Sequence, residues 1–218
     1  MPEHDLASAI FFRLPRELRN HIYTYCIESF YGNEVIVRRS RKPKAGFVLL
    51  TRKHYGPHAY QWVDDPICSL ISTDKLREEV GREMLEIYYW TRTFRFSHHE
   101  LPSVVSFLHR DHLGLGIAPV AYVRCLHLQV HHGMSTGSPT VDWTPSRQQA
   151  CVQAIAALGT MLTKRTEIII DLEGAKKFAE VEGALWMHDT PSALTILSHV
   201  RQLQNKGFRV ELRNVRNS

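Results

Sequence analysis

Apolar side chains recur at helical spacing near the start of the chain. Leu14, Leu18, Ile22 and Tyr25 fall on one stripe, which predicts a helix over residues 15–29. Stripes of this kind normally face a core, so we expect these side chains to be buried. A second helix is predicted where apolar positions again repeat at helical spacing, over residues 74–90 with Leu76, Val80, Met84, Ile87 and Tyr88.

The remaining segments alternate between strand and helix patterns. Residues 34–38 and 47–51 are apolar and flank a basic turn, which predicts a hairpin, and residues 54–66 are expected to form a loop. Further on, strands are predicted at 93–96, 122–130, 167–173 and 208–212, and helices at 101–111, from Pro145, at 175–187 and from Thr190.

This order predicts an α/β fold. An N-terminal helix and a β-hairpin are followed by alternating strands and helices, which form a mainly parallel sheet because strand–helix–strand units make right-handed crossovers. We expect residues 1–10 to be a flexible tail and residues 11–218 to form a single domain.

Composition supports a globular protein. Of 218 residues, 44% are hydrophobic and 10% aromatic, which is too apolar for a disordered chain. No apolar run approaches the roughly 18 residues of a membrane span, and the acidic N-terminal segment does not resemble a signal peptide. The cysteines form no C-x-x-C pair, which favours free thiols: they are Cys26, Cys68, Cys125 and Cys151. We expect an intracellular protein, nuclear or cytoplasmic, with no membrane partner.

Basic residues gather in one stretch of a chain whose formal net charge is +5. The basic patch consists of Arg38, Arg39, Arg41, Lys42, Lys44, Arg52 and Lys53. Such a run is typical of a solvated loop, of a nuclear-import signal, or of a surface for nucleic acid or another acidic partner. For nucleic acid, nearby aromatic rings would stack on bases: His54, Tyr55, Tyr60 and Trp62.

Residues able to carry catalysis or bind metal are present but lack a recognisable arrangement. His109 and His112 would share a helix face, yet no cysteine lies near them in sequence. Asp171 and Glu173 would point to one face at the end of a strand. No phosphate-binding glycine motif or nucleophile motif occurs. We therefore expect no enzymatic activity, no metal and no cofactor, and interpret the chain as a binding module.

Two segments together resemble the fungal F-box-like proteins. The first carries a Leu-Pro-x-Glu-Leu-Arg-x-x-Ile-Tyr pattern in Leu14, Pro15, Glu17, Leu18, Arg19, Ile22 and Tyr23. The second resembles the family's Glu-x-Leu-x-Ile-Tyr-Tyr helix and the following Thr-Phe, in Val80, Glu83, Leu85, Ile87, Tyr88, Tyr89, Thr93 and Phe94. Arg92 stands where the family usually has asparagine.

The resemblance implies a protein–protein interaction module that acts as a substrate-recognition adaptor of a ubiquitin ligase. A true F-box binds the Skp1 subunit through three small helices, whereas this chain follows its first helix with a basic hairpin. The residues that would touch Skp1 are Leu14, Pro15, Leu18 and Ile22. Packing of the same stripe in the core is the structural alternative. The other functional alternative is a nuclear nucleic-acid-associated factor that uses the basic hairpin 38–53.

Overall fold

The computed structural model of the chain describes residues 9–28, 32–41, 46–54, 60–71, 76–131, 145–173 and 191–215. The chain divides into two compact units. The first unit comprises Met1–Arg95 and Ser106–Cys125, and the second comprises Phe96–Val105 and Leu126–Ser218. The single domain expected over residues 11–218 stays a prediction.

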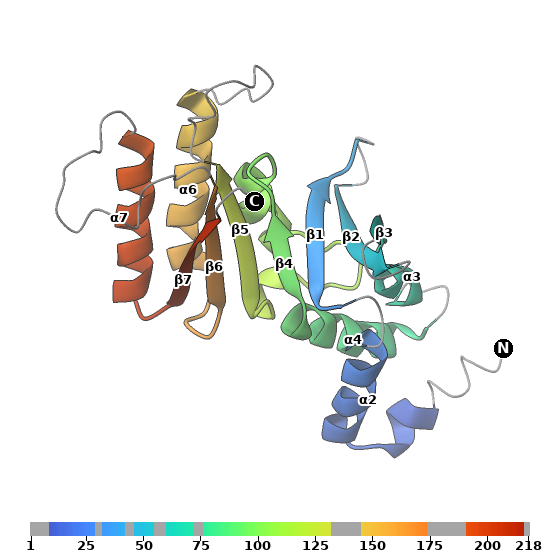
Figure 1. Cartoon of the computed structure of the whole chain (residues 1–218). Helices are drawn as coiled ribbons and strands as arrows, with labels where there is room; N and C mark the ends of the chain where they lie inside the picture. Colours follow the sequence, from blue (N-terminus) through green and yellow to red (C-terminus); the bar gives the residue numbers. More distant parts are fainter. Residues whose placement is uncertain are drawn as a thin grey trace. The chain divides into compact units, whose positions relative to one another are not determined.

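Helices and strands follow one another along the described chain as Figure 1 shows. The longer elements are α2 (Arg16–Glu28), β1 (Glu34–Arg39), β2 (Phe47–His54), β3 (Tyr60–Asp64), α3 (Pro66–Ile71), α4 (Glu78–Thr91), β4 (Thr93–Phe96), α5 (Val104–His109), β5 (Cys125–His131), α6 (Pro145–Met161), β6 (Glu167–Glu173), α7 (Pro191–Asn205) and β7 (Arg209–Val215). The helix expected over 175–187 lies outside the described residues.

Part of the expected N-terminal tail is helical. Residues 9–13 form a helical turn, and the backbone N–H of Leu14 donates to the carbonyl of Ile10 at 3.1 Å. The tail predicted over residues 1–10 is therefore wrong at residues 9 and 10, because backbone hydrogen bonding extends the helical region toward the N-terminus. Residues 1–8 lie outside the described residues.

The predicted α/β class is confirmed. The sheet is mostly parallel and is antiparallel at the edge that β2 and β3 form. Strand order is β3-β2-β1-β4 in the first unit and β5-β6-β7 in the second. The β1–β2 hairpin is also confirmed, with Arg39 opposite Phe47. The loop expected over residues 54–66 is wrong in part, because its second half pairs with β2 as β3.

Strand alternation places the core of the first unit on one face of its strands. Successive side chains of a strand point to opposite faces, and the buried ones are Val35 and Val37 on β1 and Phe94 on β4. The Phe94 ring lies 5.7 Å from the rings of Tyr88 and Tyr89 on α4, measured between centroids. The aromatic pair of α4 is therefore the layer that covers this face.

A buried carboxylate joins the end of β3 to α4. Asp65 is 3% exposed, and its Oδ1 accepts a hydrogen bond from the backbone N–H of Ile67 in the first turn of α3 at 2.9 Å. Its Oδ2 accepts from the Tyr88 hydroxyl at 2.9 Å. Burial raises the pKa of the neighbouring Cys68 thiol to about 12, so this thiol is protonated at neutral pH.

In the second unit, α6 and α7 lie side by side (Figure 1). The inward stripe of α6 includes Ile155 and Leu158, which are fully buried, and α7 buries Val200 and Leu203. A Cβ at Gly159 would lie 2.9 Å from Cδ2 of Leu203, so a larger residue there would have to displace the end of this leucine side chain. On β6, Ile168 and Ile170 are fully buried, as the apolar sequence of this strand predicts.

Two adjacent tyrosines of α4 give a matched test of this core. The Tyr88 hydroxyl donates to Asp65, whereas the buried Tyr89 hydroxyl has no hydrogen-bond partner among the described residues. We expect Tyr88→Phe to lower the free energy of unfolding by about 1–3 kcal/mol, because it leaves a buried carboxylate oxygen unsatisfied. Tyr89→Phe should leave it unchanged or raise it. Urea denaturation of both variants measures the difference, and equal losses would contradict this packing.

Candidate functional site

The first long helix, α2, turns its apolar stripe away from the core. Tyr23 and Ile27 are its buried residues, at 4% and 0% exposure. Leu18 and Tyr25, on the opposite side of the helix, are 51% and 77% exposed. The expectation that the Leu18 stripe forms core is therefore wrong.

The residues that the resemblance assigns to partner binding all retain solvent contact. Leu14 and Ile22 are half-buried, and Pro15 and Leu18 are exposed. With Tyr25 they define the α2 outer surface, which consists of Leu14, Pro15, Leu18, Ile22 and Tyr25. The family resemblance identifies four of these five residues as a partner surface. The apolar periodicity places Tyr25 on the same stripe, but it predicts that the stripe faces inward.

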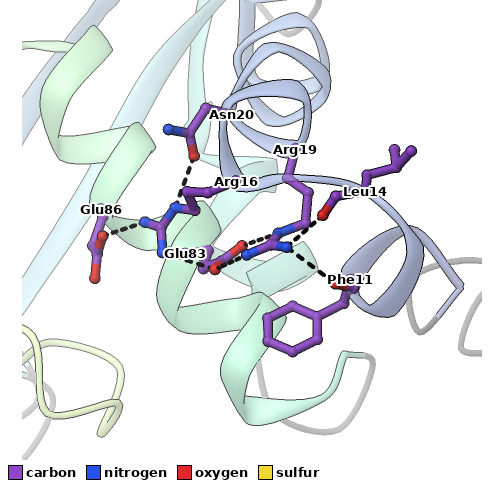
Figure 2. A network of polar contacts seen from close by, with 7 residues as sticks. All are labelled: Phe11, Leu14, Arg16, Arg19, Asn20, Glu83 and Glu86. Carbon is purple, nitrogen blue, oxygen red and sulfur yellow. Dashed lines mark hydrogen bonds and ion pairs between the residues drawn. The ribbon is translucent and has the colours of Figure 1, made fainter.

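The inward side of α2 carries two arginines that bind one carboxylate of α4. Figure 2 shows Arg16 and Arg19 converging on Glu83. Arg19 makes a bidentate contact, with Nε 2.8 Å from Glu83 Oε2 and Nη2 2.7 Å from Oε1. Arg16 Nη1 donates to Oε1 at 2.7 Å, and its Nη2 reaches Glu86 Oε2 at 2.6 Å. Bidentate guanidinium–carboxylate pairs fix orientation as well as distance, so this network sets the direction in which α2 faces.

The same arginines also hold the chain that precedes α2. Arg19 Nη1 donates to the backbone carbonyls of Leu14 at 2.7 Å and Phe11 at 3.1 Å (Figure 2). The Arg19 guanidinium lies 4.7 Å from the centre of the Phe11 ring, a cation–π contact. Arg16 Nε donates to Asn20 Oδ1 at 3.1 Å. Arg19 thus links Leu14, the first residue of the α2 outer surface, to the arginine–glutamate network.

The network is ionised at neutral pH. Burial by itself raises the pKa of Glu83, but the hydrogen bond from Arg19 and the charges of Arg16 and Arg19 outweigh it and hold the pKa below its usual value. The hydrogen bond to Glu83 raises the pKa of Arg19. Burial, followed by the Glu83 charge, raises the pKa of Tyr23 to about 12, so the phenol beside the network is neutral.

A buried arginine fixes the other end of α2. Arg92, which follows α4, is 1% exposed, and its Nη2 donates to the carbonyl of Ile27 at 2.7 Å. The last carbonyls of a helix lack partners within the helix, so Arg92 satisfies one of them. Sequence reasoning noted Arg92 only as a departure from the family pattern and missed this contact.

The structure separates the predicted basic patch into two groups. Arg38, Arg39 and Arg41 are exposed near the turn of the β1–β2 hairpin, whereas Arg52 and Lys53 are half-buried near the other end of β2. The residue of β2 that lies opposite Arg38 is four positions from Arg52 along the strand, which corresponds to ~13 Å. The antiparallel strand carries the last two members of the predicted patch away from the turn, and the binding role of the patch stays a prediction. Lys42 and Lys44 lie outside the described residues.

The histidine pair does not share a helix face. His109 is the last residue of α5 and is exposed, whereas the His112 ring packs on Phe107 with 4.6 Å between centroids. Burial lowers the pKa of His112, although its Nε2 lies 3.0 Å from the carbonyl of Phe107. Within the described ranges, no group of three or more histidine, cysteine, aspartate or glutamate side chains is arranged to hold a metal ion.

Asp171 lies inside the second unit rather than at an exposed strand end. It is 6% exposed, and its Oδ2 is 2.6 Å from Nε2 of His127 on β5. Glu173 ends β6, and its side chain is not among those described. The four cysteines are free of disulfides, as their spacing predicts.

Comparison with known proteins assigns no family. No protein-family model matches the chain, and no curated protein and no solved structure is significantly similar to it. The resemblance to the fungal F-box-like proteins thus stays a prediction. None of the described helices is both long enough and apolar enough to span a membrane.

The ion network predicts a specific pH dependence of stability. Because the pKa of Glu83 is lower in the folded protein than in the unfolded chain, the stability it contributes is present above the unfolded value of roughly 4.3 and is lost as the pH falls through the folded value. Glu83→Gln should lower the free energy of unfolding by about 3 kcal/mol at neutral pH, since it leaves the largely buried Arg19 without a carboxylate, while Arg16 keeps only Glu86.

Denaturation at a series of pH values measures this effect. The parent protein should lose stability on acidification below roughly pH 4.3 more steeply than Glu83→Gln does. Glu17→Gln, an exposed change on the same helix, is the control and should follow the parent. Parallel profiles for the parent and Glu83→Gln would show that Glu83 does not hold α2.

Proposed function

We propose that this protein is a protein–protein interaction module that binds its partner on the α2 outer surface. The observation that carries the proposal is the apolar side of α2 that faces solvent. Its charged residues Arg16 and Arg19 face α4, and its apolar residues Leu18 and Tyr25 face solvent. Surface helices ordinarily do the reverse.

Exposed apolar side chains that share one helix face are a feature of interaction sites. Covering a leucine or an aromatic side chain contributes roughly 1.5–3 kcal/mol, so Leu18 and Tyr25 together are able to anchor a partner. The ion network keeps α2 from rotating to bury them, because that rotation would move Arg16 and Arg19 away from Glu83. The surface is therefore already formed before a partner arrives, which lowers the entropic cost of binding.

The partner we propose is the Skp1 subunit of a cullin ubiquitin ligase, with this chain as a substrate-recognition adaptor. Support comes from the match between the resemblance and the exposure of individual residues. Leu14, Pro15, Leu18 and Ile22, which the family pattern assigns to this contact, all lie on the α2 outer surface and none is fully buried. The chain departs from a true F-box directly after α2, where the strand β1 replaces the second small helix.

Co-expression with Skp1 from a filamentous fungus tests the proposal. We expect a one-to-one complex that survives gel filtration. Leu18→Ser and Tyr25→Ser should each weaken it by at least about tenfold, because each removes a buried apolar contact of the complex. Their unfolding free energies should stay within about 0.5 kcal/mol of the parent, since both side chains are exposed.

His21→Ser supplies the matched control, because His21 is an exposed polar residue of the same helix. It should leave the affinity for Skp1 unchanged. A folded monomer that stays apart from Skp1 at micromolar concentration would refute the adaptor role. Loss of stability in Leu18→Ser would instead show that this side chain is core.

A further inference from the structure

The strands of the first unit bury one face and leave the other in contact with solvent. Side chains at alternate positions of a strand share a face, and the strand register carries each face across the sheet. The buried face includes Val35, Val37 and Phe94 and lies against α4. The described residues of the opposite face are all exposed or half-buried, and they define the outer sheet face: Glu34, Ile36, Arg38, Val48, Leu50, Arg52, Tyr60, Trp62, Asp64, Thr93 and Arg95.

Two aromatic rings and an arginine form one end of the outer sheet face. Arg52 of β2 lies opposite Trp62 of β3. Its guanidinium carbon lies 4.3 Å from the centre of the Tyr60 ring and 5.1 Å from that of Trp62. The two rings are nearly perpendicular, with 6.0 Å between centroids, and Tyr60 is 52% exposed. Aromatic rings and guanidinium planes both stack on unpaired bases, so this end presents base-stacking groups to solvent.

A second arginine of the outer sheet face lies toward the turn of the hairpin. Arg38 of β1 is exposed and lies opposite Val48, which is four positions, or ~13 Å, along β2 from Arg52. The guanidinium groups of Arg38 and Arg52 make no hydrogen bond or ion pair with the described residues. By contrast, Arg95 is paired with Glu34 at 3.0 Å. The outer sheet face thus offers the N–H donors of two arginines to a ligand.

We propose that the outer sheet face binds single-stranded nucleic acid. Bases stack on Trp62, Tyr60 and the Arg52 guanidinium, and Arg38 binds a phosphate near the turn of the hairpin. The ~13 Å between the two ends corresponds to about four stacked nucleotides at roughly 3.4 Å each. This activity goes beyond the proposed interaction with a protein partner and does not rest on it, because the α2 outer surface contributes no residue to the outer sheet face.

The combination of groups favours nucleic acid over an acidic protein segment. Arginines alone would serve either ligand, since carboxylates and phosphates both fit the guanidinium fork. A nucleotide also supplies a flat base for the rings of Tyr60 and Trp62, whereas an acidic side chain supplies only charge. Asp64 lies on the outer strand β3, so the phosphate chain is expected to follow β1 and β2, on the side of Arg38. The formal net charge of +5 favours a polyanion as well.

Fluorescence anisotropy with a labelled oligouridine of about ten residues and the full chain, in the absence of Skp1, tests the proposal. We expect a micromolar Kd at low salt that rises with salt concentration, because phosphate contacts release counterions. Arg38→Gln should weaken binding and reduce the slope of log Kd against log salt by about 0.7, the value for one phosphate contact of a single strand. Arg39→Gln removes the same charge one position away on the opposite face of β1, and it should bind like the parent.

Two further variants test the stacking. Trp62→Leu keeps an apolar side chain and Tyr60→Ser changes an exposed one, so both should fold, and their urea denaturation midpoints check this. Each variant should bind at least about tenfold more weakly than the parent with an unchanged salt slope, because stacking releases no counterion. A duplex of the same length should bind more weakly than the single strand, since its paired bases are not free to stack.

Leu18→Ser is the control for the α2 outer surface, and it should bind oligouridine like the parent. The proposal is overturned if the parent does not bind, if both stacking variants bind like the parent, if Arg38→Gln and Arg39→Gln are equivalent, or if the duplex binds as tightly. It is overturned equally if polyglutamate of the same charge displaces the oligomer as well as unlabelled oligouridine does. Because Skp1 is absent, these outcomes are independent of the adaptor role.

Oligothymidine distinguishes the two sources of this chemistry. Equal binding of oligouridine and oligothymidine would support recognition of phosphate and base alone. Tighter binding of oligouridine would support an additional contact to the ribose 2′-OH, and hence RNA as the ligand.

Discussion

Glu83 accepts hydrogen bonds from two arginines of α2, and the orientation of that helix depends on this contact. The carboxylate is almost fully buried, and removing Arg19 would leave it with Arg16 as its only cationic partner. Arg16, Arg19 and Tyr23 lie three or four residues apart and therefore share one side of the helix. Because that side is held against α4, Leu18 and Tyr25 on the opposite side of the helix face solvent.

In the first unit, hydrogen bonds to α4 and to the residue after it hold the neighbouring elements in place. Glu83 holds the first half of α2, and Arg92, directly after α4, binds the carbonyl of Ile27 at its end. Tyr88 of the same helix reaches Asp65, which directly follows β3. The α2 outer surface that we propose for binding is thus attached to α4, and to the arginine that follows it, by hydrogen bonds at both ends of α2.

The positions of α2, the β1–β2 hairpin and the later strands could be predicted from periodicity, because each has a clear apolar repeat. The side of α2 that faces the core could not be predicted, because arginines on a surface helix normally face water. Spacing within the helix does not reveal an acceptor 64 positions away in sequence. The available signal was Glu83, an acidic residue inside an otherwise apolar helical repeat. Similarly, β3 is short and follows Gly56 and Pro57, so local sequence favoured a loop, and only its pairing with β2 makes it a strand.

The orientation of α2 can be measured directly, because two residues of the same type lie two positions apart on opposite sides of it. Tyr23 is buried beside Glu83, and Tyr25 is exposed. Hydroxyl-radical footprinting of the native protein, read by mass spectrometry, should oxidise Tyr25 rapidly and leave Tyr23 protected, with both reacting after denaturation. Protection of Tyr25 together with oxidation of Tyr23 would show that the apolar stripe faces inward, and it would contradict the orientation described for α2 and its partner surface.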